Sequence, residues 1–210
     1  MKRRIVVPGL GLVCPIGDTV TDSWDNALAG KSGIAPIEAF DASEFSVRIG
    51  GTIKDFDVTD YISAKEARRM DPFIHFCLAA AMHAMEDSGL EFTDQNARRM
   101  GAAIGSGIGG LPGIEKGYQS FLDGGPRKVS PFFVPSNIIN MVAGNLSIKY
   151  GLKGPNYAMV TACSTGAHCI GNASRMIERG DVDVMFAGGA EFATSPTGIG
   201  GFASAKAQAT

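Results

Sequence analysis

The sequence predicts an α/β fold in which a mainly parallel sheet carries helices on both faces. Short, almost continuous apolar runs such as MGAAIGSG (100–107) and DVMFAGGAE (183–191) alternate with longer stretches of helical pattern. Strands that are buried on both faces need such runs, and their alternation with helices is typical of parallel sheets. Hydrophobic residues make up 45% of the 210 residues and charged residues 19%, which indicates a globular chain with a substantial core.

Each expected element has its own local signal. Runs of apolar, β-branched or small residues predict buried strands, at 4–13, 100–107, 156–162 and 183–191. Helical patterns lie within 19–30, 63–90, 130–151 and 164–180. In the second stretch Pro72 separates an exposed front turn from the buried helix, and the third stretch begins as a loop. Glycine ends each of these helices, at Gly30, Gly89, Gly151 and Gly180.

Composition excludes several classes of function. The net charge is −2 and neither end carries an acidic or basic tail, so nucleic-acid binding is not expected. No apolar run approaches the ~18 residues of a membrane span, and Pro8, Gly9 and Gly11 interrupt the apolar start, which favours a first strand over a signal peptide. The four cysteines form no CxxC pair and no metal-ligand spacing with the three histidines. We therefore expect a cytoplasmic protein with reduced thiols and no metal site.

Cys163 is the candidate catalytic residue. In VTACSTGAHCIG (160–171) it lies between small residues, where an expected strand ends and an expected helix begins. The free N–H groups at a helix N-terminus favour a thiolate, and the N–H of Cys163 could donate to a developing oxyanion. A buried packing cysteine is the alternative interpretation, and the local pattern leaves both open.

No histidine in the sequence is an evident base for this thiol. His168 follows Cys163 by five residues, about 500° around a helix, so the two side chains diverge. His75 and His83 lie in the helical stretch 63–90 and are expected to be core or boundary residues. The chain thus offers a nucleophile without its base.

Several segments, in the same order, resemble the β-ketoacyl-acyl-carrier-protein synthases, most closely the elongating bacterial type II branch. They are SGIAPIEAFD, GSGIGG, SPFFVPSNIINM and GPNYAMVTACSTGAHCIGNASRMIERGDVDVMFAGGAE. The resemblance implies a thiolase-like fold of two similar halves, assembled as a homodimer. It also implies that residues 1–210 form the N-terminal half, and that the activating histidines, a buried lysine and the second oxyanion donor belong to a C-terminal half. In the tail, Gln208 and Ala209 depart from the family pattern.

The resemblance assigns roles to three groups of residues. Cys163 matches the acyl-accepting nucleophile. Ile108 matches the residue that gates longer chains in the acyl pocket, and its neighbours in that pocket match Phe133, Ile138, Gly198 and Phe202. The surface that docks the acidic acyl-carrier protein matches a set of cations, Lys65, Arg68, Arg69, Arg127 and Lys128.

The implied function is fatty-acid elongation by a 3-oxoacyl-[acyl-carrier-protein] synthase. Cys163 accepts an acyl group, and malonyl-carrier protein loses CO2 and condenses with it. The resemblance implies that this reaction requires no metal or organic cofactor. The alternatives are a non-catalytic fragment or partner subunit of a ketosynthase, a polyketide ketosynthase, a thiolase that uses coenzyme A thioesters, and a cysteine hydrolase. The hydrolase needs a histidine and a carboxylate that the sequence does not place.

Overall fold

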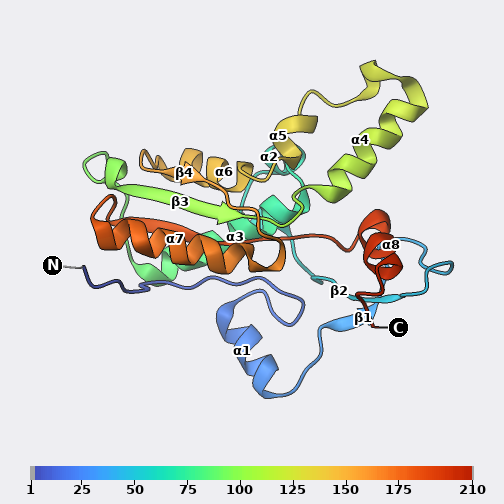
Figure 1. The fold of residues 1–210 in the computed structure, drawn as a ribbon, viewed down its shortest axis with the longest axis horizontal. Helices are drawn as coiled ribbons and strands as arrows, with labels where there is room; N and C mark the ends of the chain where they lie inside the picture. Colours follow the sequence, from blue (N-terminus) through green and yellow to red (C-terminus); the bar gives the residue numbers. More distant parts are fainter. Residues whose placement is uncertain (1–2, 210) are drawn as a thin grey trace.

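The computed structural model describes residues 3–209 and is built on a three-stranded parallel sheet (Figure 1). The strand order is β4 (Asn156–Tyr157), β3 (Met100–Gly105), β5 (Val184–Gly189). The central strand β3 pairs with β5 along its whole length, from Met100 opposite Val184 to Gly105 opposite Gly189. A separate antiparallel pair joins β1 (Ile34–Pro36) to β2 (Ile49–Gly51).

Helices cover both faces of the parallel sheet, as the apolar strand patterns predict. On one face lie α3 (Pro72–Ser88) and α6 (Met141–Tyr150), whose Phe73, Val142 and Leu146 pack with Ile104 of β3. On the other face lies α7 (Thr165–Arg179), whose Cys169 and Ala173 pack against Ala103. Every residue of β3 is buried because its side chains alternate between these two layers.

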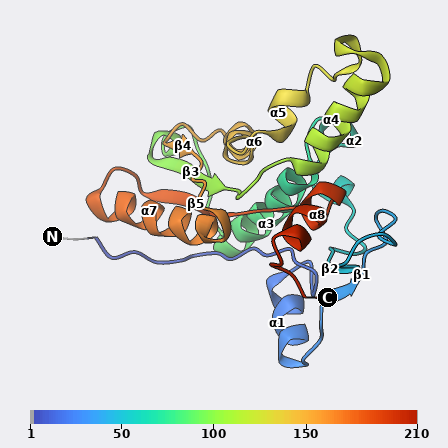
Figure 2. The ribbon, with the colours of Figure 1, turned by 45° about the vertical axis from the view of Figure 1, so that its right-hand side comes forward.

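The remaining elements surround this three-layered centre (Figures 1 and 2). The other α-helices are α1 (Val20–Leu28), α2 (Ala64–Ala67), α4 (Leu111–Gly124), α5 (Phe133–Asn137) and α8 (Pro196–Ser204). Short 3-10 turns complete the chain, at η1 (Val58–Asp60), η2 (Ala97–Arg99), η3 (Pro126–Lys128) and η4 (Ala162–Ser164). Both views show α4 projecting away from the sheet, with α5 and α2 beside its base.

Asp71 connects α4 to α3, because its carboxylate caps the N-termini of both helices. Its buried carboxylate accepts hydrogen bonds from the Phe73 N–H at the start of α3 (3.3 Å) and from the Gly113 N–H at the start of α4 (2.8 Å). Burial raises the pKa of this carboxyl, and the two backbone donors oppose that rise. At the other side of α4, Glu115 accepts from Ser195 Oγ (2.8 Å), which ties α4 to the start of α8.

The first expected strand is wrong. Residues 3–13 pair with no strand, and Val6, Val7 and Leu10 are exposed. The segment instead crosses α3 at close range: a Cβ added at Gly11 would lie 1.7 Å from the carbonyl oxygen of Ala80. An apolar run shows only that a segment can be buried, and this one contacts a helix with its backbone instead of joining the sheet.

Two other expectations need correction. The strand expected at 156–162 pairs only at Asn156–Tyr157, and the chain then runs unpaired to the 3-10 turn η4. The sequence interpretation also missed α4, whose PG pair at its start and Gly117 in its centre lower its intrinsic helix propensity. Packing requires the second glycine, since a Cβ on Gly117 would lie 2.3 Å from the Phe133 ring.

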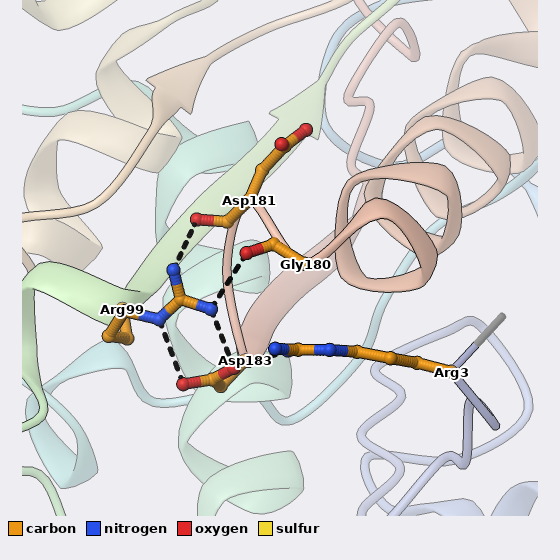
Figure 3. Close-up of polar contacts among 5 residues, drawn as sticks. All are labelled: Arg3, Arg99, Gly180, Asp181 and Asp183. Carbon is orange, nitrogen blue, oxygen red and sulfur yellow. Dashed lines mark hydrogen bonds and ion pairs between the residues drawn. The ribbon is translucent and has the colours of Figure 1, made fainter. Parts of the chain in front are cut away.

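A network of charged side chains lies at the end of the sheet where β3 and β5 begin (Figure 3). Arg99 donates to both carboxylate oxygens of Asp183 (2.9 and 2.8 Å) and to the carbonyl oxygens of Gly180 and Asp181 (both 2.9 Å). Arg3 donates to Asp183 as well (2.7 Å). Hydrogen bonds from Arg99, then Arg3, hold the pKa of the Asp183 carboxyl well below its usual range. Asp183 and Arg99 together thus connect the N-terminal segment, the start of β3 and the end of α7.

We expect Asp183→Asn to lower the melting temperature at pH 7 by about 2–4 °C, since a partly exposed ion network contributes ~1 kcal/mol. A carboxyl with a lowered native pKa contributes stability above its unfolded pKa of ~3.9, and that contribution is lost as the pH falls further. The difference between the two proteins should therefore narrow from pH 4 downward in thermal melts. An equal difference at pH 7 and pH 3 would show that the Asp183 charge is not responsible.

Candidate active site

Cys163 lies in η4, at the turn between the unpaired end of the 156–162 segment and α7. Its side chain is exposed, and its N–H donates no hydrogen bond within residues 3–209. The preceding residue, Ala162, has a φ of +51°, in the left-handed region that a non-glycine residue rarely occupies. Such strain of ~1–3 kcal/mol is typical of functional turns, and here it presents a thiol and a free N–H together at the start of a helix.

Glycines let this turn approach the ends of the central strands. A Cβ on Gly105, the last residue of β3, would lie 2.0 Å from the carbonyl oxygen of Met159 and 2.5 Å from Thr165 Cγ2. A Cβ on Gly189, the last residue of β5, would lie 3.1 Å from the Cα of Gly166 in α7. The strand-to-helix turn is thus packed against backbone, with no room for side chains between.

Hydrogen bonds within the turn hold its shape. The N–H of Thr161 donates to Oγ1 of the buried Thr165 (2.8 Å), and the N–H of Ser164 donates to the carbonyl oxygen of Thr161 (3.1 Å). His168 Nδ1 lies 2.7 Å from Thr161 Oγ1. His168 therefore binds the residue two before Cys163, and among residues 3–209 the sulfur of Cys163 has no hydrogen-bond partner.

The other two histidines have structural partners, as expected. His75 lies 3.0 Å from the carbonyl oxygen of Ala67, and burial lowers its pKa. His83 lies 3.1 Å from the hydroxyl of Tyr61 and packs against that ring. Neither hydrogen-bonds to Cys163, so within residues 3–209 no histidine is a hydrogen-bond partner of this thiol.

The remaining cysteines differ from Cys163 in exposure. Cys77 and Cys169 are buried in the two layers around the sheet, and burial raises the pKa of the Cys77 thiol to about 12. Cys14 is partly buried, with its sulfur 3.3 Å from Ser23 Oγ. Cys163 is therefore the cysteine whose side chain is exposed, so it is not a buried packing residue, and its role as a nucleophile stays a prediction.

An apolar groove of about 590 Å³ runs beside the cysteine turn. Three of the expected acyl-pocket residues line it, namely Ile108, Phe133 and Ile138. Ala158 and Val160, from the segment that leads into Cys163, also line it. Cys163 itself does not, so the groove flanks the thiol. Its lining fits an alkyl chain better than a polar ligand.

The other two expected pocket residues lie on α8, away from the groove lining. Gly198 is buried, and a Cβ there would lie 2.1 Å from the carbonyl oxygen of Ala193 and 3.1 Å from Leu111 Cδ2. Phe202 is exposed near the other end of the same helix. Within residues 3–209, Gly198 supports the start of α4, and Phe202 does not reach the groove.

Sequence reasoning missed Glu191, which lies two residues after the end of β5. Its carboxylate accepts hydrogen bonds from Ser106 Oγ (2.9 Å) and from the N–H groups of Gly107 (2.8 Å) and Ile108 (2.9 Å). The sequence does show an acidic residue shortly after an expected parallel strand. Binding sites in such sheets lie at the carboxyl ends of the strands, so this position pointed to the site.

The five expected docking cations lie in two groups. Lys65 is in α2, and Arg68 and Arg69 follow that helix; the Arg69 guanidinium lies 4.5 Å above the ring of Phe132. Arg127 and Lys128 form η3 at the far end of α4. The one acid of α2, Glu66, forms a capping box with Ser63, whose hydrogen bonds lower the pKa of the Glu66 carboxyl.

The described residues show neither a metal centre nor a membrane span. Nowhere in residues 3–209 do three or more His, Cys, Asp or Glu side chains gather into a group that could hold a metal ion. No helix in that part of the chain combines the length and the apolar character needed to cross a bilayer.

This chain is similar to known ketoacyl synthases. The family described as "Beta-ketoacyl synthase, N-terminal domain" matches residues 2–210. The "3-oxoacyl-[acyl-carrier-protein] synthase 2" of Vibrio harveyi is 59% identical over 100% of this chain, and that of Vibrio cholerae serotype O1 is 58% identical. The chain spans 50% of each of these relatives. A solved β-ketoacyl synthase from Burkholderia phymatum has a TM-score of 0.85 at 26% identity, over 100% of this chain and 51% of that one.

Proposed function

Because this chain belongs to the β-ketoacyl synthase family, whose N-terminal domain it matches, we propose that it is the N-terminal half of a 3-oxoacyl-[acyl-carrier-protein] synthase of fatty-acid elongation. One structural observation carries the proposal: Cys163 is exposed at a strained turn at the start of α7, beside an apolar groove. The function for which these relatives are named supplies the substrate class.

In the proposed reaction, the Cys163 thiolate attacks the carbonyl carbon of an acyl thioester. The oxyanion receives a hydrogen bond from the Cys163 N–H, the carrier thiolate leaves, and the acyl group remains on sulfur. The alkyl chain extends along the groove past Ile108 and Ile138. A malonyl thioester then loses CO2, and its α-carbon attacks the Cys163 thioester. The product is a 3-ketoacyl thioester, and the cysteine thiolate is regenerated.

The described residues serve the first step better than the second. They supply the nucleophile, one oxyanion donor and the groove, whereas none of the three histidines reaches Cys163. We propose that a C-terminal half supplies the histidines and the second oxyanion donor. No cofactor is needed, since every bond change is between thioester, cysteine and carboxylate.

The direct test measures acyl transfer and condensation with the protein at its natural length, that is, with the proposed C-terminal half included. Octanoyl-carrier protein should add one octanoyl group to the Cys163 peptide in mass spectra, and radiolabelled malonyl-carrier protein should then release CO2. Acyl transfer without any CO2 release would instead support a non-condensing partner subunit. A protein that takes no acyl group from any thioester contradicts the proposal.

We propose that Lys65, Arg68 and Arg69 dock the acidic carrier protein. Reversing these three charges to glutamate at natural length should raise KM for acyl-carrier protein at least about tenfold and leave kcat nearly unchanged, because rim charges mainly steer association. The effect should shrink in high salt. Small acyl thioesters should react as in the wild type.

A matched control for the docking prediction reverses one charge elsewhere. Arg98 lies in η2, before the N-terminal end of β3, so Arg98→Glu should leave KM for the carrier unchanged while Arg68→Glu raises it. Equal losses with carrier and with small thioesters would indicate a damaged fold instead of lost docking.

We also propose that two copies associate through the apolar surface of α4 and α5. Large exposed side chains gather there, at Tyr118, Leu122, Val134 and Ile138. Apolar surface of this kind usually marks an interface.

We propose a cytoplasmic location as well, which fits the four free cysteines, because the reduced thiol of Cys163 is the reactive form.

A further inference from the structure

In the loop 105–110, which carries Ile108, two backbone N–H groups donate to the same carboxylate, that of Glu191. The N–H groups of Gly107 and Ile108 both donate to Oε2 of Glu191, at 2.8 and 2.9 Å. Ser106 Oγ donates to Oε1 (2.9 Å) and accepts from the Gly109 N–H (3.0 Å). We propose that Glu191 is a positioning residue that fixes this loop and so decides which acyl chains the groove accepts.

Glu191 is a firm anchor because of its place in the sheet. It follows β5, and the ladder between β5 and β3 continues one residue further, where the Ala190 N–H donates to the carbonyl oxygen of Gly105 (3.1 Å). The carboxylate and the start of the loop therefore leave the same end of two paired strands. Their separation is set by the sheet and not by the loop itself.

The anchored loop touches both parts of the site. A Cβ added at Gly107 would lie 2.7 Å from Glu191 Oε2 and 3.4 Å from the Cα of Ala162, so Gly107 is held between the carboxylate and the cysteine turn. The next residue, Ile108, has a 40% exposed side chain that lines the groove with Val160. Fixing the N–H groups on Glu191 fixes the direction in which the Ile108 side chain leaves the backbone.

Glu191 holds the first half of this loop, whereas Gly110 at its far end donates to the carbonyl oxygen of Asn137 (3.0 Å). Four of the six residues in GSGIGG (105–110) are glycine, and Gly109 has a φ of +87°. A glycine-rich backbone has many accessible conformations. The order of this loop therefore depends on the hydrogen bonds that its N–H groups donate to Glu191. Loss of the carboxylate should let Ile108 move, and the wall of the groove with it.

The inference rests on the proposed function, and its test compares short and long acyl groups at natural length. Loading of Cys163 is followed with butyryl and lauroyl thioesters. Glu191→Ala should change the ratio of the two kcat/KM values on the order of tenfold. Glu191→Gln should stay near the wild type, since one amide oxygen can accept both N–H groups while its NH2 group faces Ser106 Oγ. A wild-type ratio in Glu191→Ala overturns the proposal.

A double-mutant cycle separates positioning from general stability. If Glu191 acts through Ile108, Glu191→Ala should no longer alter the ratio in an Ile108→Ala background. Additive effects overturn the proposal. The control is Asp183→Asn, at the opposite end of β5, which should lower stability without changing the ratio. If Glu191→Ala does not fold, Ser106→Ala, which removes one donor to the carboxylate, replaces it in the cycle.

Hydrogen exchange tests the anchor without any activity. The amides of Gly107 and Ile108 should exchange faster in Glu191→Ala than in the wild type, while the amides of β3 stay protected. Unchanged exchange at 107 and 108 overturns the anchor. If the wild type takes no acyl group at all, the proposed function fails, and the exchange experiment still decides whether Glu191 holds the loop.

Discussion

Replacement of Cys163 by alanine should abolish acyl transfer and condensation, with a loss of at least about a thousandfold in kcat/KM at natural length. Removal of the attacking atom leaves no route to the acyl-enzyme, and single nucleophile deletions in other enzymes cost this much or more. The measurement is the acyl mass on the protein together with CO2 release from malonyl-carrier protein. Because the side chain is exposed, the melting temperature should change little.

Cys14→Ala is the control for this prediction, since Cys14 is the other cysteine with exposed surface. It should load acyl groups at the wild-type rate. In the wild type, iodoacetamide should label Cys163 first, Cys14 more slowly, and the buried Cys77 and Cys169 only on unfolding. Uniform labelling of the four residues, or full acyl transfer by Cys163→Ala, would assign the chemistry to another group.

The parts of the fold that the sequence predicts are those with continuous apolar runs or with capping residues at the ends of a helix. Strand 100–105 is buried along its whole length, strand 184–189 is half-buried up to its exposed last residue, and both are apolar throughout. Helix α3 has its stop and start signals next to it, with Asp71 at the N-cap, Pro72 in the first turn and Gly89 in the left-handed conformation at the C-cap. These signals are local and can be read without the tertiary structure.

The missed elements depend on contacts between distant residues. The apolar run at 4–13 resembles a strand in sequence, but it has no strand partner within residues 3–209. Helix α4 is opposed by its own glycines, and it forms because Asp71 caps it and because Phe133 packs over Gly117. Propensity is a weak guide wherever such packing decides the outcome.

The same division holds at the candidate site. Cys163 could be predicted because small residues surround it at the end of an apolar run. The positive φ of Ala162 could not, since alanine gives no sign of that conformation. Glu191 is 83 residues from Ile108 in the chain, and only the pairing of β3 with β5 brings the two together. A single sequence shows an acid after a strand but not the loop that it binds.

The largest expected effect on the fold is that of Gly105→Ala. The new Cβ would lie 2.0 Å from the Met159 carbonyl oxygen and 2.5 Å from Thr165 Cγ2, and neither the strand ladder nor the cysteine turn can retreat without breaking hydrogen bonds. Overpacking of this kind costs about 1–3 kcal/mol, or roughly 3–10 °C in the melting temperature of a chain of this size. Because the displaced groups flank Cys163, acyl loading at natural length should fall about a hundredfold as well.

Gly171→Ala is the matched control for Gly105→Ala. Gly171 lies in α7, and a Cβ there would meet no atom within 4 Å, so alanine should stabilise the helix by about 0.5–1 kcal/mol. Thermal melts of the 210-residue chain should therefore move in opposite directions for the two glycine variants. If Gly105→Ala melts at or above the wild-type temperature, the close approach of β3 to the cysteine turn is not what holds that turn in place, and the strain at Ala162 must be supported by the hydrogen bonds of Thr161 and Thr165 alone.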